Sequence, residues 1–204
     1  MELLVATTNP GKFKEVSAFL NDFPLRIVSL TDLLDPPIVI EDGLTFEENA
    51  VKKARALAEF SGLLTLADDS GLEVDALNGD PGIYSARYAG NECDDDKNNQ
   101  KLLRELQGVP EGKRTARFVC VLALCSPGSS VADWSAREVC EGRIAYSLHG
   151  EHGFGYDPIF FYPPMGKTFG EIDRETKATV SHRGKALKRL AAAFRDLIGS
   201  AKQT

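Results

Sequence analysis

The sequence predicts an α/β fold, in which a mixed β-sheet carries helices on its flanks. Through the first third of the chain, short apolar strand-like segments alternate with amphipathic helical segments, an order typical of layered α/β proteins. Two long β-rich stretches, 115–125 and 132–146, come later and are joined by a short Ser-Pro-Gly-Ser-Ser connection. Their length and the connection between them favour a long antiparallel ribbon.

The N-terminal third divides into strands and helices in alternation. The predicted elements are a strand at 2–6, a helix at 11–22, a strand at 25–29, a helix at 46–60 and a strand at 63–68. The helix at 46–60 is the best marked. Thr45 precedes it as a cap, Glu48 follows three residues later as in a capping box, and Gly62 closes it.

The remaining elements are shorter or lie near the C-terminus. We expect short strands over 71–89, with turns at 78–79 and 80–82, and a helix over 97–107. A last helix at about 182–198 carries one apolar stripe made of Ala186, Leu187, Leu190, Ala193, Phe194 and Leu197. No repeat or long linker interrupts the chain, so we predict one domain over residues 1–204.

Bulk composition restricts the classes of partner. A formal net charge of −6 disfavours a general nucleic-acid-binding surface, because such surfaces need an excess of Lys and Arg. No apolar run approaches the ~20 residues of a membrane helix, and the chain starts without a signal-peptide pattern, so we expect a cytoplasmic protein. The cysteines form no C-x-x-C pair, which favours buried, reduced thiols over zinc ligands or disulfides.

The stretch "VATTNPGKFKEV", residues 5–16, resembles a phosphate-binding loop in having Gly11 and Lys12 after a strand. It is not a P-loop, because Ala6 and Phe13 replace two of the fixed residues of that motif. A strand, a polar turn and a helix start still offer backbone N–H groups, a positive dipole end and the Lys12 charge to an anion. The alternative is an ordinary capped helix that follows an edge strand.

Two acidic segments are candidates for a metal site. In "LADDSGLEVD", residues 66–75, Asp68 and Asp69 follow an apolar strand and point to opposite faces if the backbone is extended. In "VIEDGLTF", residues 39–46, Glu41 and Asp42 precede the capped helix. One carboxylate from each segment suits Mg²⁺, which keeps waters and binds substrate phosphates. The alternative is that Asp68 and Asp69 only occupy a turn.

Lysines and aromatic residues mark three further candidate segments. Lys53 shares a helical stripe with Asn49, whereas the adjacent Lys52 points elsewhere, and either lysine could belong to a solvated face. In "GFGYDPIF", residues 153–160, glycines flank an aromatic residue and an acid follows, which suits close approach to a ligand or a β-bulge.

The last candidate segment is "TKATVSHRGKAL", residues 176–187. We expect Lys177 to precede a turn, and His182 and Arg183 to stand at the start of the last helix. Cations are disfavoured at the positive end of a helix dipole unless an anion or a polar ligand is present. His149 and His152 lack the additional His or Cys neighbours that a zinc site needs, so we regard them as weak candidates.

Taken in order, these motifs resemble the inosine triphosphate pyrophosphatase family, also called the Ham1-like or non-canonical purine nucleoside triphosphatase family. The resemblance runs from Thr7 to about Leu197 and rests on T-x-N-x-x-K, E-D-G-x-T-F-x-E-N-A-x-x-K-A, A-D-D-S-G-L, P-G-I-Y-S-A-R-Y, F-G-Y-D-P-I-F and S-H-R-G-K-A-L. It implies hydrolysis of ITP, dITP and XTP to the monophosphate and pyrophosphate with Mg²⁺. It also implies a homodimer with an elongated α/β fold of two lobes around a central cleft.

The resemblance assigns roles residue by residue. Asp69 is implied as the general base and as a metal contact together with Glu41. The implied triphosphate loop and phosphate contacts are Thr7, Thr8, Asn9, Pro10, Gly11, Lys12, Lys53 and Ser70. The implied base pocket is formed by Phe154, Gly155, Tyr156 and Asp157 and closed by Lys177, His182 and Arg183. Two alternatives stay open: a Maf-like pyrophosphatase acting on modified pyrimidine triphosphates, and a nucleotide sensor without turnover.

Overall fold

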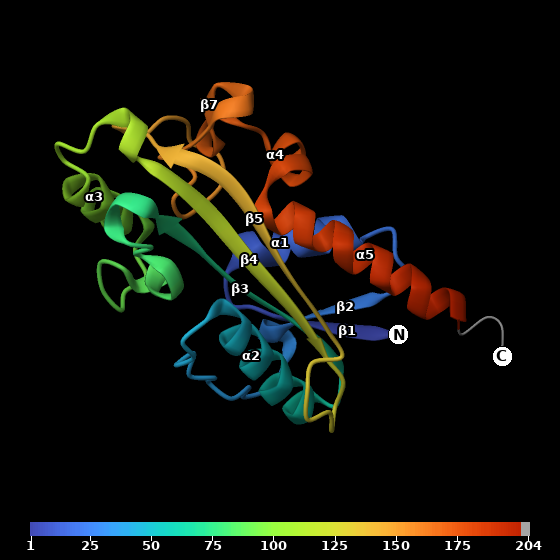
Figure 1. Ribbon diagram of the computed structural model, residues 1–204. Coiled ribbons are helices and arrows are strands. Elements are labelled where there is room, and N and C mark those ends of the chain that lie inside the picture. The colour runs from blue at the N-terminus through green and yellow to red at the C-terminus, as the bar shows by residue number, and fades with distance from the viewer. Residues whose placement is uncertain (201–204) are drawn as a thin grey trace. The chain divides into compact units, whose positions relative to one another are not determined.

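A single mixed β-sheet organises the part of the chain that the computed structural model describes, namely the backbone of residues 1–200 and the side chains of residues 1–194. The strand order within this range is β2-β1-β3-β4-β5-β6-β7 (Figure 1). Strand β1 (Glu2–Ala6) pairs in parallel with β2 (Arg26–Ser29) and with β3 (Leu64–Val74). The parallel edge confirms the α/β alternation predicted for the N-terminal third.

The other strands complete the mixed sheet. Strands β4 (Thr115–Cys125) and β5 (Trp134–Ile144) form the long ribbon predicted from the sequence, and Figure 1 shows β3, β4 and β5 running in alternating directions. Strand β6 (Phe160–Tyr162) pairs antiparallel with β5 and with β7 (Lys167–Thr168). The mixed sheet with flanking helices is therefore confirmed.

The chain forms two compact units, and each has its own hydrophobic core. Unit 1 consists of Met1–Asp69, Cys120–Glu138 and the chain from Arg183 onward. Unit 2 consists of Ser70–Val119 and Val139–His182. Because the boundaries fall within strands β3, β4 and β5, each of these strands supplies residues to both units.

In unit 1, helices cover both faces of the sheet. The apolar stripes of α1 (Pro10–Leu20) and α5 (His182–Ser200) pack against alternate residues of β1, β3 and β4. Helix α2 (Phe46–Ser61) contacts β1 through its own buried side chains, and it lies on the opposite side of the strands from α5 (Figure 1). The buried stripe of α5 includes Ala186, Leu187, Leu190 and Phe194, as predicted, whereas the side chain of Leu197 lies outside the described residues.

The helix starts and ends follow the capping residues of the sequence. Asn9 caps α1, and the Thr45 hydroxyl accepts the N–H of Glu48 at the start of α2. The Glu48 carboxylate accepts the N–H of Leu44 at 2.7 Å, so the predicted box closes one residue earlier than expected. Gly62 ends α2 in the left-handed conformation with φ +68°, where a residue with a Cβ is strained.

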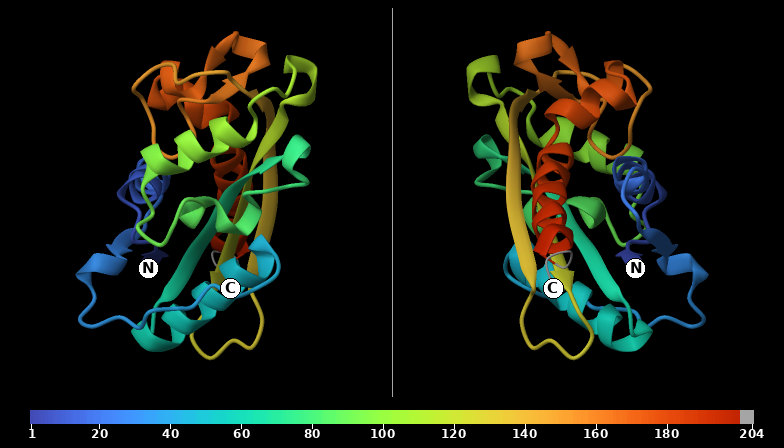
Figure 2. Two further views of the ribbon diagram at one scale, coloured as in Figure 1. Left: turned by 90° about the vertical axis from the view of Figure 1, so that its left-hand side faces the viewer. Right: turned by 90° about the vertical axis from the view of Figure 1, so that its right-hand side faces the viewer.

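The 126–133 connection between β4 and β5 is an open loop close to the C-terminal end of α2 (Figure 2). Its Gly128 N–H donates to the Glu59 carboxylate of α2 at 3.1 Å, and Asp133 closes the hairpin through its N–H to the Leu124 carbonyl. A Pro-Gly-Ser sequence suits this connection, because the backbone reverses direction here. The reversal also brings the Gly128 N–H to the Glu59 side chain.

In unit 2, parts of the three shared strands pack with helices and loops. Its core joins β3, β4 and β5 to α3 (Asp95–Glu105) and to the segment that carries β6. Helix α4 (Arg174–Val180) follows β7. The short 3-10 turns in the described residues are Leu30–Asp32, Asp75–Leu77, Gly82–Arg87, Glu111–Lys113, Pro163–Met165 and Phe169–Glu171.

Two expectations for unit 2 were wrong. Residues 71–89 were expected to be short strands, but β3 continues to Val74 and 3-10 turns follow over Asp75–Leu77 and Gly82–Arg87. The predicted turn residues reverse the chain there, which leaves 82–87 with no strand to pair with. Lys177 was expected before a turn, but it lies within α4, whose cap is Asp173. The sequence signal for that helix is the Asp173 carboxylate, which accepts the N–H of Thr176.

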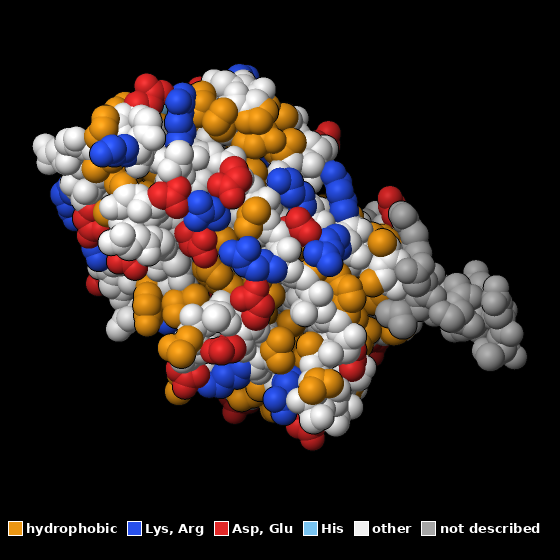
Figure 3. Space-filling view, viewed as in Figure 1, with side chains coloured by type: hydrophobic (Ala, Val, Ile, Leu, Met, Phe, Trp, Pro, Cys, Tyr) orange, Lys and Arg blue, Asp and Glu red, His pale blue; other side chains and the backbone are white. Residues whose placement is uncertain are grey.

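Other bulk expectations concern surface and thiols. Cys120, Cys125 and Cys140 are buried and Cys93 is exposed, and none of the four forms a disulfide. On the face seen in Figure 3, described basic and acidic side chains are interspersed and form no large patch of one sign. Among the described residues, none of the helices combines the length and apolar character needed to cross a membrane.

Arg114 is a buried cation of unit 2 whose partners are backbone carbonyls. Its guanidinium donates to the carbonyls of Leu106, Ile144 and Ala145 at 2.8–2.9 Å, and the residue is 2% exposed. The side chain therefore ties the end of α3 to the end of β5.

We expect Arg114→Leu to lower the free energy of unfolding by roughly 2–5 kcal/mol, because three carbonyls each lose a hydrogen bond from the buried guanidinium. Denaturant unfolding measures the loss. The exposed neighbour offers a matched control, since Lys113→Leu removes a cation without removing these bonds. Equal stability losses in the two variants would contradict this account of Arg114.

Candidate functional site

Asp68 and Asp69 lie inside β3, and not at a turn as one alternative held. Both are buried, with exposed fractions of 4% and 7%. Because successive side chains of a strand point to opposite faces, the two carboxylates have different surroundings. The structure thus separates two residues that the sequence places side by side.

Asp68 accepts from two cations of unit 1. Lys12 Nζ lies 2.6 Å from its Oδ1, and Arg183 Nε donates to its Oδ2 at 2.7 Å. The Cys120 thiol also donates to Oδ2, at 3.3 Å. Burial alone would raise the pKa of the Asp68 carboxyl, but the Arg183 guanidinium and the Lys12 ammonium hold that pKa well below its usual range. Asp68 is therefore an anchor that is ionised at neutral pH.

Asp69 is the opposite case. Its Oδ2 is buried and has no hydrogen-bond partner among the described residues. Burial raises the pKa of its carboxyl to about 6; Lys12 and Lys53 act against this shift, whereas Glu41 and Asp68 add to it. A carboxylate with a pKa close to neutral and one unengaged oxygen is suited to accept a proton or to bind a cation.

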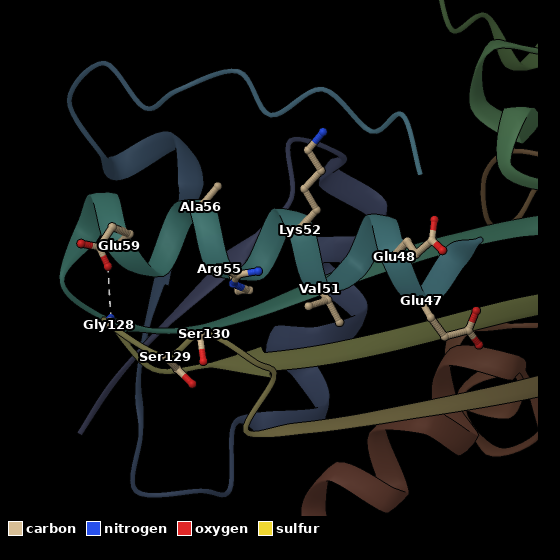
Figure 4. Close-up of a pocket in the computed structure, with 10 residues that line it drawn as sticks. All are labelled: Glu47, Glu48, Val51, Lys52, Arg55, Ala56, Glu59, Gly128, Ser129 and Ser130. Carbon is tan, nitrogen blue, oxygen red and sulfur yellow. Dashed lines mark hydrogen bonds between the residues drawn. The ribbon is translucent and has the colours of Figure 1, made fainter. Parts of the chain in front are cut away.

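Glu41 and Lys53 meet beside this carboxylate. Lys53 Nζ donates to Glu41 Oε1 at 2.9 Å, and both residues influence the pKa of Asp69. The adjacent Lys52 instead pairs with Asp42, and both are largely exposed. Figure 4 shows Lys52 at a hollow between α2 and the 126–133 connection, together with charged residues of α2. The expectation that only one of the two lysines shares the Asn49 stripe is consistent with these separate partners.

The N-terminal loop gives α1 its start and brings Lys12 to Asp68. The Asn9 side chain accepts the N–H groups of Gly11 and Lys12 at 2.8 and 3.0 Å, and Thr7 Oγ1 accepts the N–H of Asn9. Thr8 and Pro10 are exposed. The expectation of free N–H groups at this helix start was wrong for Gly11 and Lys12, because the cap occupies them. What the loop offers an anion is the Lys12 charge and the helix dipole.

A divalent cation fits this part of unit 1. The unengaged Asp69 oxygen and the Glu41 carboxylate are hard oxygen donors, of the kind that Mg²⁺ takes. No group of three or more His, Cys, Asp or Glu residues placed to hold a metal occurs in the described part of the chain. A cation here would therefore complete its shell with water or with substrate oxygens, which is the usual situation for Mg²⁺.

Unit 2 holds the second group of candidate residues, in the loop before β6. Asp157 Oδ2 accepts the N–H of Phe154 at 2.9 Å and lies 2.5 Å from Lys177 Nζ. Gly153 packs directly on this carboxylate, since a Cβ built there would lie 1.9 Å from Asp157 Oδ2. Glycine is thus required at 153 for the loop to close on its own acid.

Lys177 and the aromatic residues form one buried cluster. Lys177 is 3% exposed, and its Nζ lies 4.8 Å from the centre of the Phe154 ring, a cation–π distance. The Tyr156 hydroxyl donates to the Ser85 carbonyl at 2.8 Å. The structure therefore brings together Phe154, Tyr156, Asp157 and Lys177, four of the predicted base-pocket residues.

His182 and Arg183 are neighbours in the chain with different surroundings. The His182 ring stacks on Phe118 of unit 2, with centroids 4.7 Å apart. Arg183 instead pairs with Asp68 and with Glu15, whose Oε2 lies 2.5 Å from Arg183 Nη1. A cation is unfavourable at the positive end of a helix dipole. The carboxylates of Asp68 and Glu15 compensate for this in the case of Arg183. Ser70 is half-buried at the first position of unit 2.

Sequence reasoning missed several partners of these residues. Glu15 and Cys120 join the Asp68 cluster, and Ser85, Asp95 and Asn99 support the loop at 153–157. Glu15 lies on α1 one turn after Lys12, which is the one local signal for its role. The others are far away in sequence, and no short-range pattern marks them.

Comparison with known proteins gives consistent matches along the chain. A family model described as the Ham1 family matches residues 3–193. The chain is 53% identical over 189 residues to a dITP/XTP pyrophosphatase of Desulforamulus reducens, covering 93% of each chain. It is 47% identical over 203 residues to a dITP/XTP pyrophosphatase of Geobacillus kaustophilus, covering 100% of this chain and 98% of that protein.

Solved structures agree with these sequence matches. A HAM1 protein from Coxiella burnetii superimposes with a TM-score of 0.87 at 39% identity, covering 96% of this chain and 99% of that one. The Ham1 protein of Staphylococcus aureus gives a TM-score of 0.85 at 40% identity, with the same coverage.

The contrast between the two aspartates predicts opposite effects on stability. The folded-state pKa of Asp69, about 6, lies above its ordinary value of 3.8, so the folded protein binds more protons than the unfolded chain between these pH values. Stability therefore falls as pH rises through that window. At pH 7.5 without divalent cations, Asp69→Asn should be more stable than the wild type by up to about 3 kcal/mol, and the gain should vanish near pH 4.

Asp68→Asn should instead lower stability at pH 7.5 by roughly 3–5 kcal/mol, because it leaves buried cations without their partner. In the wild type, the folded-state pKa of Asp68 is lowered. The contribution of Asp68 to the free energy of unfolding is therefore present above the unfolded-state pKa and is lost as pH falls toward the folded-state pKa. Denaturant unfolding of both variants at the two pH values is the measurement. The same sign for both variants at pH 7.5 would show that the two carboxylates are not in these different environments.

Proposed function

Because the chain belongs to the Ham1 family, we propose that it hydrolyses the non-canonical purine nucleoside triphosphates ITP, dITP and XTP to the monophosphate and pyrophosphate. Relatives that are dITP/XTP pyrophosphatases support this activity for dITP and XTP. The observation in the structure that carries it is the buried Asp69 carboxylate, which has one unengaged oxygen and interacts with two lysines and with Glu41.

The proposed chemistry uses Asp69 as general base. It takes a proton from a water whose oxygen attacks the α-phosphorus, and the bond from that phosphorus to the α,β-bridging oxygen breaks to release pyrophosphate. A pKa of about 6 keeps Asp69 ionised at neutral pH while it remains basic enough to accept the proton. Lys12 and Lys53 supply positive charge near the carboxylate, which suits the developing charge on the leaving group.

Mg²⁺ is the proposed cofactor, held by Glu41 and Asp69. When bound, it would neutralise phosphate charge and polarise the phosphoryl oxygens. The residues of this chain orient the reaction: Asp69 faces the cation site, and Lys53 holds Glu41 in place at 2.9 Å. Asp68 stays out of the chemistry, because Lys12 and Arg183 already occupy its oxygens.

The purine is proposed to bind to the cluster of unit 2. A 6-oxo purine presents an acceptor where adenine presents an amino donor, so a cation or N–H donor at that edge favours the former. Lys177 is the buried donor of the cluster, and Phe154 supplies an aromatic face. His182 and Gly155 belong to the same proposal, and Ser70 is proposed to contact the substrate.

Arg183 stays in the proposed base pocket, which it closes together with Lys177 and His182. It also bonds Asp68 and Glu15 of unit 1, so we propose that it holds Asp68 in place as well. We also propose that the chain acts as one domain over residues 1–204, as a homodimer in the cytoplasm, where the nucleotide pool is found.

A screen of nucleoside triphosphates tests the proposed function. We expect ITP, dITP and XTP to be hydrolysed at least ~10²-fold more efficiently than ATP, since only a 6-oxo purine presents an acceptor to a donor at that edge. Release of pyrophosphate, and not orthophosphate, is expected. Asp69→Asn should lower kcat at least ~10²-fold while the protein stays folded.

The same screen separates the alternatives. Preference for modified pyrimidine triphosphates would favour a Maf-like pyrophosphatase. Tight nucleotide binding without any turnover would favour a sensor. Either result contradicts the proposal.

The two adjacent lysines of α2 offer a matched pair. Lys53→Ala should raise KM for ITP or lower kcat by about tenfold or more, because it removes a charge that interacts with Asp69 and Glu41. Lys52→Ala should stay within about twofold of the wild type, since its partner Asp42 is exposed. Steady-state kinetics decides between them, and equal effects of the two changes would refute the distinction.

A further inference from the structure

Gly155 is held from both sides of its backbone by one helix. Asp95 Oδ2 accepts the Gly155 N–H at 2.7 Å, and Asn99 Nδ2 donates to the Gly155 carbonyl at 2.9 Å. Asp95 and Asn99 are four residues apart on α3, so they lie on one face of the helix. All of these residues belong to unit 2.

Asp95 and Asn99, the two residues that bond Gly155, differ in exposure. Asp95 is exposed in the first turn of α3, whereas Asn99 is 2% exposed. The Asn99 amide oxygen has no hydrogen-bond partner among the described residues, so the bond to the Gly155 carbonyl is the one that this side chain is seen to make. Burying an amide that makes a single hydrogen bond costs free energy, so packing alone does not account for Asn99 at this position.

The residue of α3 before Asn99 supports a different segment. Asn98 Oδ1 accepts the N–H of Ala89 at 2.7 Å, and its Nδ2 donates to the carbonyl of Ala86 at 3.0 Å. That segment contains Ser85, whose carbonyl accepts the Tyr156 hydroxyl. Helix α3 therefore reaches the loop at 153–157 by two routes, directly at Gly155 and through Ser85 to Tyr156.

Gly155 is the position where this loop has most conformational freedom. Its φ is +61° and a Cβ built there would meet nothing within 4 Å, so local sterics do not hold it. On either side, Phe154 and Tyr156 carry the aromatic rings of the proposed base pocket. Fixing both polar groups of Gly155 fixes the two adjoining peptide planes, and with them the starting directions of both side chains.

We propose that Asp95 and Asn99 are positioning residues for base discrimination: by holding Gly155 they keep the 153–157 loop in the geometry that selects 6-oxo purines. This inference rests on the proposed function. Neither side chain touches substrate or reacting atoms. The chemistry at Asp69 does not depend on them, so their loss should affect recognition of the base and leave the hydrolytic step intact.

The test uses steady-state kinetics of purified full-length variants with ITP and with ATP. Asp95→Ala and Asn99→Asp each remove one of the two bonds, and Asn99→Asp also places a carboxylate oxygen against the Gly155 carbonyl. We expect each to raise KM for ITP about tenfold, to narrow the ITP-to-ATP ratio of kcat/KM by about the same factor, and to leave kcat for ITP within about twofold.

Two further variants serve as controls. Asp96→Ala removes another first-turn acid of α3, so it matches Asp95→Ala in its effect on the helix dipole without touching Gly155. Asp95→Asn retains an oxygen that can accept the Gly155 N–H, so it should restore most of the wild-type ITP-to-ATP ratio.

The outcomes separate clearly. The positioning role would be overturned if Asp95→Ala left the ITP-to-ATP ratio of kcat/KM unchanged. It would also be overturned if kcat and KM for ITP both changed and thermal stability fell to match. The same ratio change in Asp96→Ala would do so as well, because the effect would then come from helix charge. A wild-type protein without preference for ITP over ATP would refute the proposed function itself, whatever the variants do.

Discussion

The arrangement of unit 1 depends on one buried anion, Asp68. Its carboxylate receives Lys12 from α1, Arg183 from α5 and the Cys120 thiol from β4. Ionised groups are expensive to bury, and they persist only where partners and hydrogen bonds compensate for the lost water. Glu15 completes the compensation by taking the other side of the Arg183 guanidinium. Two helices are thus fixed to β3 by charges, in addition to the apolar contacts that cover the same strand.

Strand geometry lets the adjacent carboxylate behave differently. Asp69 is rotated to the other face of β3 by the alternation of side chains along an extended chain. It is buried without receiving the close ion pairs that Asp68 has, so burial dominates and its pKa rises to about 6. The pair Asp68-Asp69 therefore divides between anchoring and proposed catalysis. The different surroundings of the two carboxylates follow from their position inside a strand, where neighbouring side chains point to opposite faces.

Features that depend on neighbouring residues in the chain were predictable from the sequence. The cap at Thr45, the stop at Gly62 and the two long strands were all predicted from neighbouring residues, and the opposite faces of Asp68 and Asp69 from strand alternation. Partners distant in the chain were not predictable in this way: Arg183 bonds carboxylates 115 and 168 residues away. The motif resemblance suggested which segments form the site, but it could not show that Asp68 and Glu15 occupy Arg183. Segment 71–89 failed because its turn residues were recognised while its lack of a strand partner was not visible in the sequence.

The division into units has a consequence for how this chain tolerates cutting. The polypeptide passes from one unit to the other between Asp69 and Ser70, Val119 and Cys120, Glu138 and Val139, and His182 and Arg183. Since neither unit is a continuous piece of chain, no single truncation releases one intact, and a proteolytic nick in any of the three shared strands cuts a segment that contributes to both units.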